Sequence, residues 1–207
     1  MSGGYDINRA IANAFGNYSW YGAERIPLQT GRTISDGLVL AAGAPPYTVT
    51  SAFGRIVWAG SAATTTGVEW DIGVPGEYAR DKPAEDDELR FLMIVKAASA
   101  AETMTPTLLY QRAGSALSSS IVMTGYKKAT TLDGLESASF TSTATVTLTN
   151  APTQPEAVML QFKNAGLKPF DAARFTLAPA ATTTGTISLF GLWMLPKRYI
   201  AIEQFRK

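Results

Sequence analysis

The chain has 207 residues, of which 46% are hydrophobic and 17% charged, and its formal net charge is +1. This length fits one large β-sandwich that buries its own core without disulfides or a metal. Cysteine and histidine are absent, which excludes disulfides, thiolate nucleophiles, Ser-His-Asp triads and the common zinc and haem ligands. Because charges of both signs are interspersed without a basic stripe, we expect no binding to nucleic acid.

Neither a membrane span nor a secretory leader is expected. No apolar run approaches the length of about 18 residues that crosses a bilayer. The N-terminal residues lack the basic region and the unbroken apolar region of a secretory signal. We therefore expect a protein that is made in a cytoplasm and does not enter a membrane.

The N-terminal segment predicts a short helical arm. Over residues 6–15, Asp6 can cap the helix, and Ile7, Ile11 and Phe15 recur at a spacing of four to form one apolar stripe. A helix this short is not stable alone, so the stripe is expected to pack on something else. Its partner is either its own domain or a neighbouring subunit.

An aromatic cluster follows the predicted arm. Residues 16–32 mix glycine, asparagine, aromatic residues and proline without a period, as expected for an extended linker, and they contain Tyr18, Trp20 and Tyr21. Exposed aromatic side chains stack on sugars and also anchor protein interfaces. Packing on the domain or a subunit contact is the favoured interpretation, because interfaces are enriched in aromatic residues.

From residue 33 onward the sequence is typical of strands. Residues 68–72 alternate apolar and acidic side chains, the pattern of a half-buried strand. About ten short strands with turn signals between them predict a sandwich or barrel. The expected fold is all-β, a jelly-roll-like antiparallel β-sandwich at residues 33–207 behind a short N-terminal arm and linker at 1–32. The other predicted strands cover residues 34–40, 47–59, 88–96, 107–111, 120–124, 143–149, 158–163, 175–177 and 186–195.

The strand at residues 88–96 is predicted to lie in the middle of a sheet. Its odd-numbered residues are apolar, and Leu92 and Ile94 make the middle of the other face apolar too. A central strand covered on both faces has this pattern. Further residues expected to face the core are Ala144, Val146 and Leu148 in the strand at 143–149, and the tryptophans Trp58, Trp70 and Trp193.

Two acidic features could carry chemistry. Glu69 and Asp71 share one face of a strand, and carboxylate pairs catalyse glycoside hydrolysis. However, Trp70 points inward between them, so ordinary polar positions on an exposed face are the favoured interpretation. The run at residues 85–88 lacks the spacing of a calcium loop and is favoured as a solvated turn. We expect no catalytic residue, no metal, no cofactor and no enzymatic activity.

The short arm, the Thr/Ser/Ala-rich strand array and the aromatic late strand at residues 187–193 (ISLFGLW) resemble tailed-bacteriophage virion proteins. The resemblance is to capsid cement or decoration proteins, many of which are jelly-roll-like and trimeric. It implies a non-enzymatic structural protein on the capsid surface of the virion, made in the host cytoplasm. It also implies a homotrimer that binds the major capsid protein and stabilises the head by bridging neighbouring capsid subunits. The expected partner-binding residues are Ile7, Ile11, Phe15, Tyr18, Trp20 and Tyr21.

The alternative function is carbohydrate binding. Carbohydrate-binding jelly rolls share the strong strand at residues 88–96 and the aromatic final strand. The chain would then be a carbohydrate-binding β-sandwich module of a fibre or receptor-binding protein, with a glycan as its ligand. The basic and aromatic C-terminal tail at residues 197–207 either closes the fold or contacts an acidic neighbour.

Overall fold

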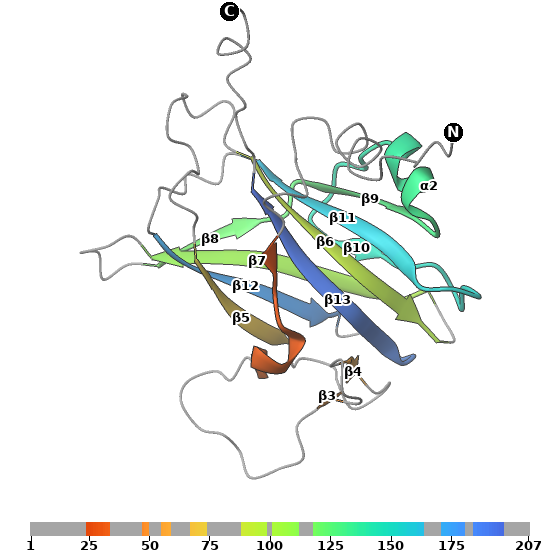
Figure 1. Ribbon diagram of the computed structural model, residues 1–207, viewed down its shortest axis with the longest axis horizontal. Coiled ribbons are helices and arrows are strands. Elements are labelled where there is room, and N and C mark those ends of the chain that lie inside the picture. The colour runs from red at the N-terminus through yellow and green to blue at the C-terminus, as the bar shows by residue number, and fades with distance from the viewer. Residues whose placement is uncertain are drawn as a thin grey trace, which may run out of the picture.

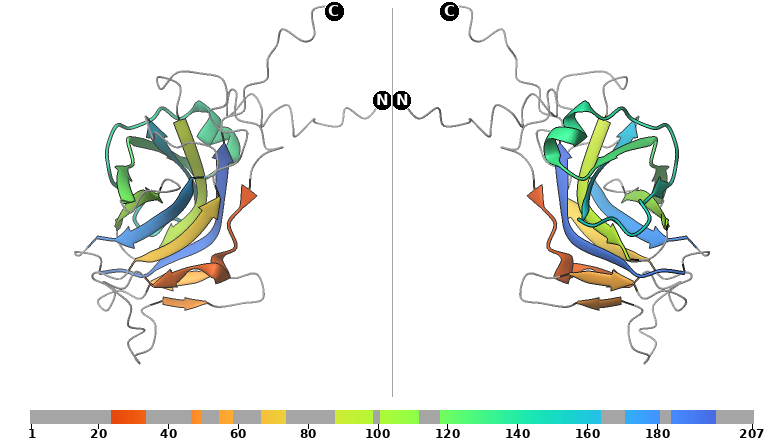
Figure 2. Two further views of the ribbon diagram at one scale, coloured as in Figure 1. Left: turned by 90° about the vertical axis from the view of Figure 1, so that its left-hand side faces the viewer. Right: turned by 90° about the vertical axis from the view of Figure 1, so that its right-hand side faces the viewer.

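Two antiparallel sheets face each other in the computed structural model (Figures 1 and 2). All strand pairs within the described ranges are antiparallel. This confirms the expected all-β, jelly-roll-like antiparallel β-sandwich. In the ranges that are described, no helix is long and apolar enough to cross a membrane. The structure describes residues 24–33, 47–49, 55–58, 67–73, 88–98, 101–111, 118–163, 171–180 and 184–196.

Sheet A contains the strands β1 (Glu24–Arg25), β3 (Tyr47–Val49), β4 (Ile56–Trp58), β6 (Glu88–Ala97), β9 (Gly125–Ala129), β11 (Glu156–Lys163) and β13 (Ile187–Pro196). Their order is β3-β4-β13-β6-β11-β9, and β1 also pairs with β13. One edge of the long strand β13 pairs with β6. The other edge pairs with β4 near the beginning of β13 and with β1 near its end. The segment predicted at 47–59 thus contains two strands, β3 and β4, which pair with each other.

Sheet B contains the strands β2 (Arg32–Thr33), β5 (Val68–Gly73), β7 (Thr103–Gln111), β8 (Ser118–Val122), β10 (Val146–Thr147) and β12 (Ala172–Pro179). Their order is β10-β7-β12-β5-β2, and β8 also pairs with β7. Strands β5, β12 and β7 therefore lie side by side, and their outer face points away from sheet A (Figure 1).

An aromatic stack joins the two sheets. The ring of Phe175 on β12 lies 4.3 Å from that of Phe91 on β6, at an interplanar angle of 24°. Trp70 stacks on the same Phe175 ring at 6.1 Å, and Phe162 meets Phe91 edge-on at 5.6 Å. All four side chains are fully buried, so the stack forms the middle of the main core.

Strand β6 is covered on both faces, as its sequence predicts. Its odd-numbered apolar residues belong to the main core between the sheets. On the outer face, Leu92 packs in a second cluster with Met159, Leu195 and Leu135. Leu135 comes from the helix α2 (Leu132–Ser137), which packs against β9 and β11 of sheet A.

A β-bulge in β13 changes which residues face the core. The register with β6 shifts between Leu189 and Gly191, so Leu189 and Leu192 both point into the main core. A bulge adds one residue to a strand and reverses the alternation beyond it. Trp193, expected to be a core residue, therefore packs half-buried against the second cluster on the outer face of sheet A and not in the main core between the sheets. Trp58 and Trp70, in contrast, are core residues as expected.

Strand β7 changes its partner at Pro106. Residues 103–104 pair with β10, and residues 107–111 pair with β8 on the same edge. Proline has no backbone N–H to donate to a neighbouring strand, so Pro106 is tolerated at the position where β10 has ended and β8 has not yet begun to pair. The strand continues through it and begins at Thr103, before the predicted start at Thr107.

Two predicted segments differ from the structure. Within the linker expected at 16–32, β1 pairs with sheet A and Arg32 of β2 pairs with sheet B, so that part belongs to the sandwich. The division into residues 1–32 and 33–207 otherwise stays a prediction. In the strand expected at 143–149, Ala144 is exposed and only β10 pairs, because the Thr143 hydroxyl accepts a hydrogen bond from the Thr145 N–H and turns the chain.

Candidate functional site

A cavity of about 270 Å³ lies where β5, β7 and β12 run side by side. On β12, the buried Phe175 packs against Phe91 of sheet A, so its neighbour Arg174 points to the outer face of sheet B. The register places Arg174 between Asp71 on β5 and Leu109 on β7. The described residues that line the cavity are Asp71, Leu109, Tyr110, Gln111, Ala172, Ala173 and Arg174.

Arg174 is held between two carboxylates. Its Nε donates a hydrogen bond to Asp71 Oδ1 at 2.9 Å, and its Nη1 lies 3.4 Å from Glu69 Oε1. The side chains of Arg174 and Asp71 are 40% and 59% exposed, whereas that of Glu69 is 13% exposed. Exposed ion pairs contribute little to stability, about 0–1 kcal/mol. The main effect of the pairs is therefore to fix the orientation of the planar guanidinium at the cavity.

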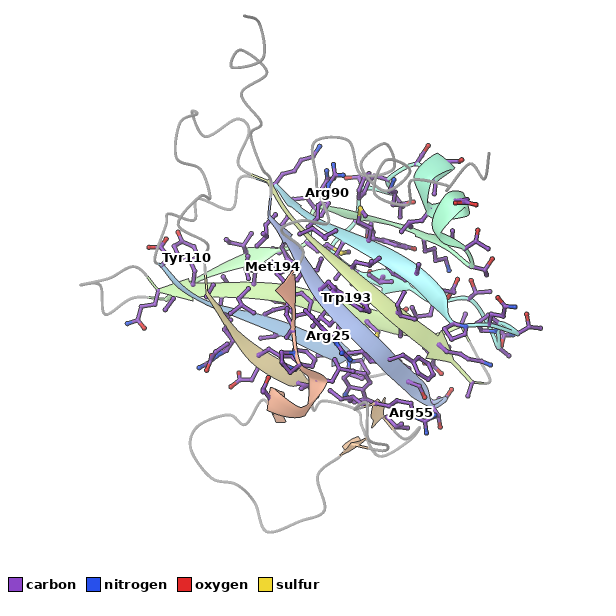
Figure 3. All side chains as sticks on the ribbon, in the orientation of Figure 1. Arg25, Arg55, Arg90, Tyr110, Trp193 and Met194 are labelled. Atoms are coloured by element: carbon purple, nitrogen blue, oxygen red, sulfur yellow. The ribbon has the colours of Figure 1, made fainter. Side chains whose placement is uncertain are left out.

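Gln111 supplies a further polar side chain at the end of β7, where it is exposed on the same face as Arg174 and Leu109. Its neighbour Tyr110 points to the opposite face, where it is half-buried and packs against the main core. Figure 3 shows Tyr110 at the end of the sheet, away from Arg25 and Trp193 of sheet A. The outer face at the cavity thus combines the apolar side chain of Leu109 with a carboxylate, an amide and a guanidinium, which is the mixture of apolar surface and convergent polar groups typical of ligand sites.

A row of threonines continues from the cavity along β7. Thr103, Thr105 and Thr107 alternate with buried Met104, Pro106 and Leu108 and lie on the outer face of sheet B. All three are half-buried. Beside the row on β12, the Thr176 hydroxyl donates a hydrogen bond to the Thr107 carbonyl at 3.2 Å.

The acidic pair Glu69 and Asp71 fits the interpretation of polar positions on an exposed face. Both carboxylates point outward from β5 and contact the same guanidinium. In glycosidases, by contrast, the two carboxyl groups flank the bond to be cleaved. In the ranges that the structure covers, no group of three or more histidine, cysteine, aspartate or glutamate residues could hold a metal ion. The absence of a metal and of catalysis stays a prediction.

The partner-binding residues expected from the sequence lie outside the described residues, as do the tail at 197–207 and residues 85–87 of the acidic run. The structure therefore leaves the predicted arm contact untested. The expected partner-binding residues that lie outside the described ranges are Ile7, Ile11, Phe15, Tyr18, Trp20 and Tyr21.

Sequence reasoning missed Arg174 and Gln111. Arg174 is 103 residues from Asp71 in the chain, so no local pattern joins them. One available signal was the alternation around Arg174, which stands as a charged residue between apolar neighbours on a predicted strand. That pattern places Arg174 on an outward face but does not say which strand lies beside it.

Comparisons with known proteins found no matching family model and no matching curated protein. Among solved structures, the chain is similar to a xylan-binding module, CBM15, with 11% identity and a TM-score of 0.45 over 85% of this chain and 97% of that one. It is also similar to the CBM22-1–GH10 modules of Clostridium thermocellum endo-1,4-β-D-xylanase 10B, with 9% identity and a TM-score of 0.45. That match covers 83% of this chain and 27% of the xylanase chain.

A third similar structure is the CBM22-1 xylan-binding domain of Paenibacillus barcinonensis Xyn10C, with 10% identity and a TM-score of 0.37 over 74% of this chain and 80% of that one. TM-scores this low at this identity give no basis for assigning a function. Of the resemblance expected from the sequence, the β-sandwich fold is confirmed. No matching family or curated protein supports the capsid cement assignment.

Proposed function

We propose that the chain is a non-catalytic carbohydrate-binding module whose ligand occupies the cavity at Arg174. The observation that carries the proposal is the guanidinium of Arg174, fixed between Asp71 and Glu69 and beside Leu109 at a cavity on the outer face of sheet B. This function was the alternative expected from the sequence.

The polar groups of the cavity match the hydroxyl groups of a sugar. Each hydroxyl both donates and accepts, a carboxylate accepts on two oxygens, and a guanidinium donates through five N–H groups in one plane. Among the described residues, Arg174 uses Nε and Nη1 for its ion pairs. The two N–H groups of Nη2 therefore remain to donate to a ligand, from a side chain whose orientation is already fixed.

Side chains that are already ordered before binding raise the affinity for a ligand that makes only weak polar contacts. Association costs free energy for every side chain that becomes ordered on binding, about 0.5–1.5 kcal/mol for a flexible one. Arg174 is ordered by its two carboxylates. Leu109, which the register places beside Arg174 on the same face, offers apolar surface to a sugar ring.

The test is glycan-array screening followed by titration calorimetry with the best neutral glycan. Arg174→Ala and Arg174→Lys are both expected to weaken binding about 10-fold or more, since a hydrogen bond to a charged group contributes about 1.5–3 kcal/mol. The lysine variant keeps the charge but loses the planar fork. The matched control is Arg25→Ala, an exposed arginine of sheet A, which is expected to leave the affinity unchanged.

Two results would contradict the proposal: a screen without any glycan signal, or an Arg174→Ala variant that binds as tightly as the wild type. A screen without signal, together with co-sedimentation of the protein with phage capsids, would favour the capsid cement function instead. Light scattering on the same sample would then test the expected trimer.

A further inference from the structure

We propose that the edge strand β8 is an interaction surface and that its partner is β8 of a second copy of this chain. The two copies form a two-fold dimer in which their B sheets become one continuous sheet. The pairing itself is argued from the edges of the fold. Its consequence for ligand binding rests on the proposed function.

Strand β8 lacks the usual protection of an edge. An edge strand presents backbone N–H and C=O groups that can pair with another strand. Within the described ranges, β8 pairs with β7 and with no other strand, and Figure 1 shows it at the rim of sheet B. Its five residues, SSSIV, contain neither a charge nor a proline. Its last residue, Val122, is the only exposed large apolar side chain among the described residues.

The other described edges are short, charged or covered. Strand β9 carries Lys127 and Lys128, and the backbone of its Tyr126 exchanges two hydrogen bonds with Thr141, at 3.0 and 2.7 Å. Strands β1, β2 and β10 have two residues each, and β3 has three. Short length, lysine side chains and a covering segment are the features that keep sheets from joining at their edges. Pairing with another chain is therefore expected at β8.

A second copy fits this edge because the strand is complementary to itself. Two identical strands that pair antiparallel are related by a two-fold axis, so the contact closes at a dimer. The register that pairs all five residues centres on Ser120, so that Ser120 of each copy lies opposite Ser120 of the other. Residues that lie opposite each other point to the same face of the sheet. Because β8 is uncharged, the two copies meet without repulsion.

The dimer brings two cavities onto one face. A two-fold axis perpendicular to the joined sheet keeps the outer faces of both copies on the same side. The strand order becomes β12-β7-β8 followed by β8-β7-β12 of the other copy. Five steps of about 4.8 Å separate the two β12 strands, so the two Arg174 side chains lie about 24 Å apart. Glycans that are displayed densely on a surface could then occupy both cavities, which raises the apparent affinity.

The experiment is sedimentation velocity of the full chain over a series of micromolar concentrations. A contact of five residues per copy is smaller than the interface of a stable complex, so the wild type is expected to shift from monomer to dimer as its concentration rises. Ser120 is exposed, and Ser120→Lys or Ser120→Glu places like charges directly opposite each other. Each variant alone is expected to stay monomeric, whereas their equimolar mixture should form the dimer again. That recovery would also show that both variants are folded.

The matched control is Ser139→Lys, which adds the same charge at an exposed serine outside the strands and should dimerise like the wild type. A wild type that stays monomeric or forms a trimer would overturn the inference. So would a dimer that persists in Ser120→Lys, because the contact would then lie elsewhere.

The consequence for ligand binding is tested with one glycan, measured in solution and on a densely coated surface. The ratio of surface affinity to solution affinity is expected to be at least about 10-fold higher for the wild type than for Ser120→Lys. Equal ratios would contradict the joint use of two cavities. If the dimer forms but no glycan binds, the proposed function fails and the β8 contact stands.

Discussion

The indole ring of Trp193 lies over Gly191, two residues earlier on the same outer face of β13. A Cβ atom at position 191 would lie 2.5 Å from Cζ3 of this ring. Real Cβ atoms do not approach other heavy atoms this closely, so any larger residue at position 191 would force the indole to shift from its place on the strand. The bulge at residue 190 and the glycine together let the tryptophan lie on the strand as part of the second apolar cluster.

Gly191→Ala is therefore expected to destabilise the fold by about 1–3 kcal/mol, the usual cost of overpacking. Urea unfolding followed by circular dichroism measures the change. In a Trp193→Ala background the ring is gone, so the same glycine substitution should cost much less. An equal loss in both backgrounds would show that the indole is not the cause.

The stack of Phe175 on Phe91 joins the sheets at the middle of the core. Phe175→Ala removes the ring that also contacts Trp70 and Phe162, and it is expected to lower the free energy of unfolding by about 3–5 kcal/mol. Phe175→Leu, which fills part of the space, should lose less. Val122→Ala is the control, since Val122 is 54% exposed and should change stability by less than about 0.5 kcal/mol. A Phe175→Ala loss no larger than this control would contradict the role of the stack.

Alternation of apolar and polar residues predicted most of the sandwich, because one face of each strand is buried and the other is not. Strand β5 shows this most clearly, with buried Val68, Trp70 and Ile72 between outward acidic residues. Even the two apolar faces of β6 follow from its sequence. The pattern says which residues face inward, but it carries no information on which strands become neighbours.

Strand β9 escaped prediction because its lysines replace the apolar alternation. The side chain of Lys127 is buried over the ring of Phe140, with Nζ 5.3 Å from the ring centroid. Lys128 points to the other face, where its Nζ lies 3.4 Å from Glu156 Oε1. Both roles depend on residues distant in the chain, and the same is true of Arg174 between Glu69 and Asp71. Local periodicity could place these charges on a face but could not pair them.

Glu156 is a buried carboxylate with three partners at the side of the sandwich. It accepts hydrogen bonds from the backbone N–H and the hydroxyl of Thr149, and its Oε1 also faces Lys128. Its side chain is 3% exposed. Glu156→Ala removes both hydrogen bonds that the exposed Thr149 makes to this charged acceptor, and a loss of about 1–3 kcal/mol is expected in chemical unfolding.

Two variants resolve the contributions at Glu156. Glu156→Gln keeps an acceptor for Thr149 and loses the charge, so it should be less damaging than the alanine. Lys128→Met removes the half-buried cation and keeps the apolar stem, so it should cost less than either. Lys128→Met also removes the hydrogen bonds of Nζ to the Thr147 carbonyl and the Thr149 hydroxyl. If this variant were as destabilising as Glu156→Ala, the contacts of Lys128 and not the hydrogen bonds from Thr149 to Glu156 would be the main contribution.

Thr131 caps the helix that covers the outer face of sheet A. Its hydroxyl accepts a hydrogen bond from the Gly134 N–H at 3.0 Å, and the helix presents the fully buried Leu135 to the second cluster. Loss of such a cap costs about 1 kcal/mol. Thr131→Ala is therefore expected to lower the free energy of unfolding by that amount, whereas Thr131→Ser should keep it because serine supplies the same acceptor.

The loss of the cap should also appear locally, because α2 is short. Amide hydrogen exchange is expected to become faster at Leu135 and Ala138, whose N–H groups donate to the carbonyls of Thr131 and Gly134. Faster exchange spread evenly over β6 and β13 would instead mean that the cap stabilises the sandwich as a whole, and that α2 does not open as a separate unit.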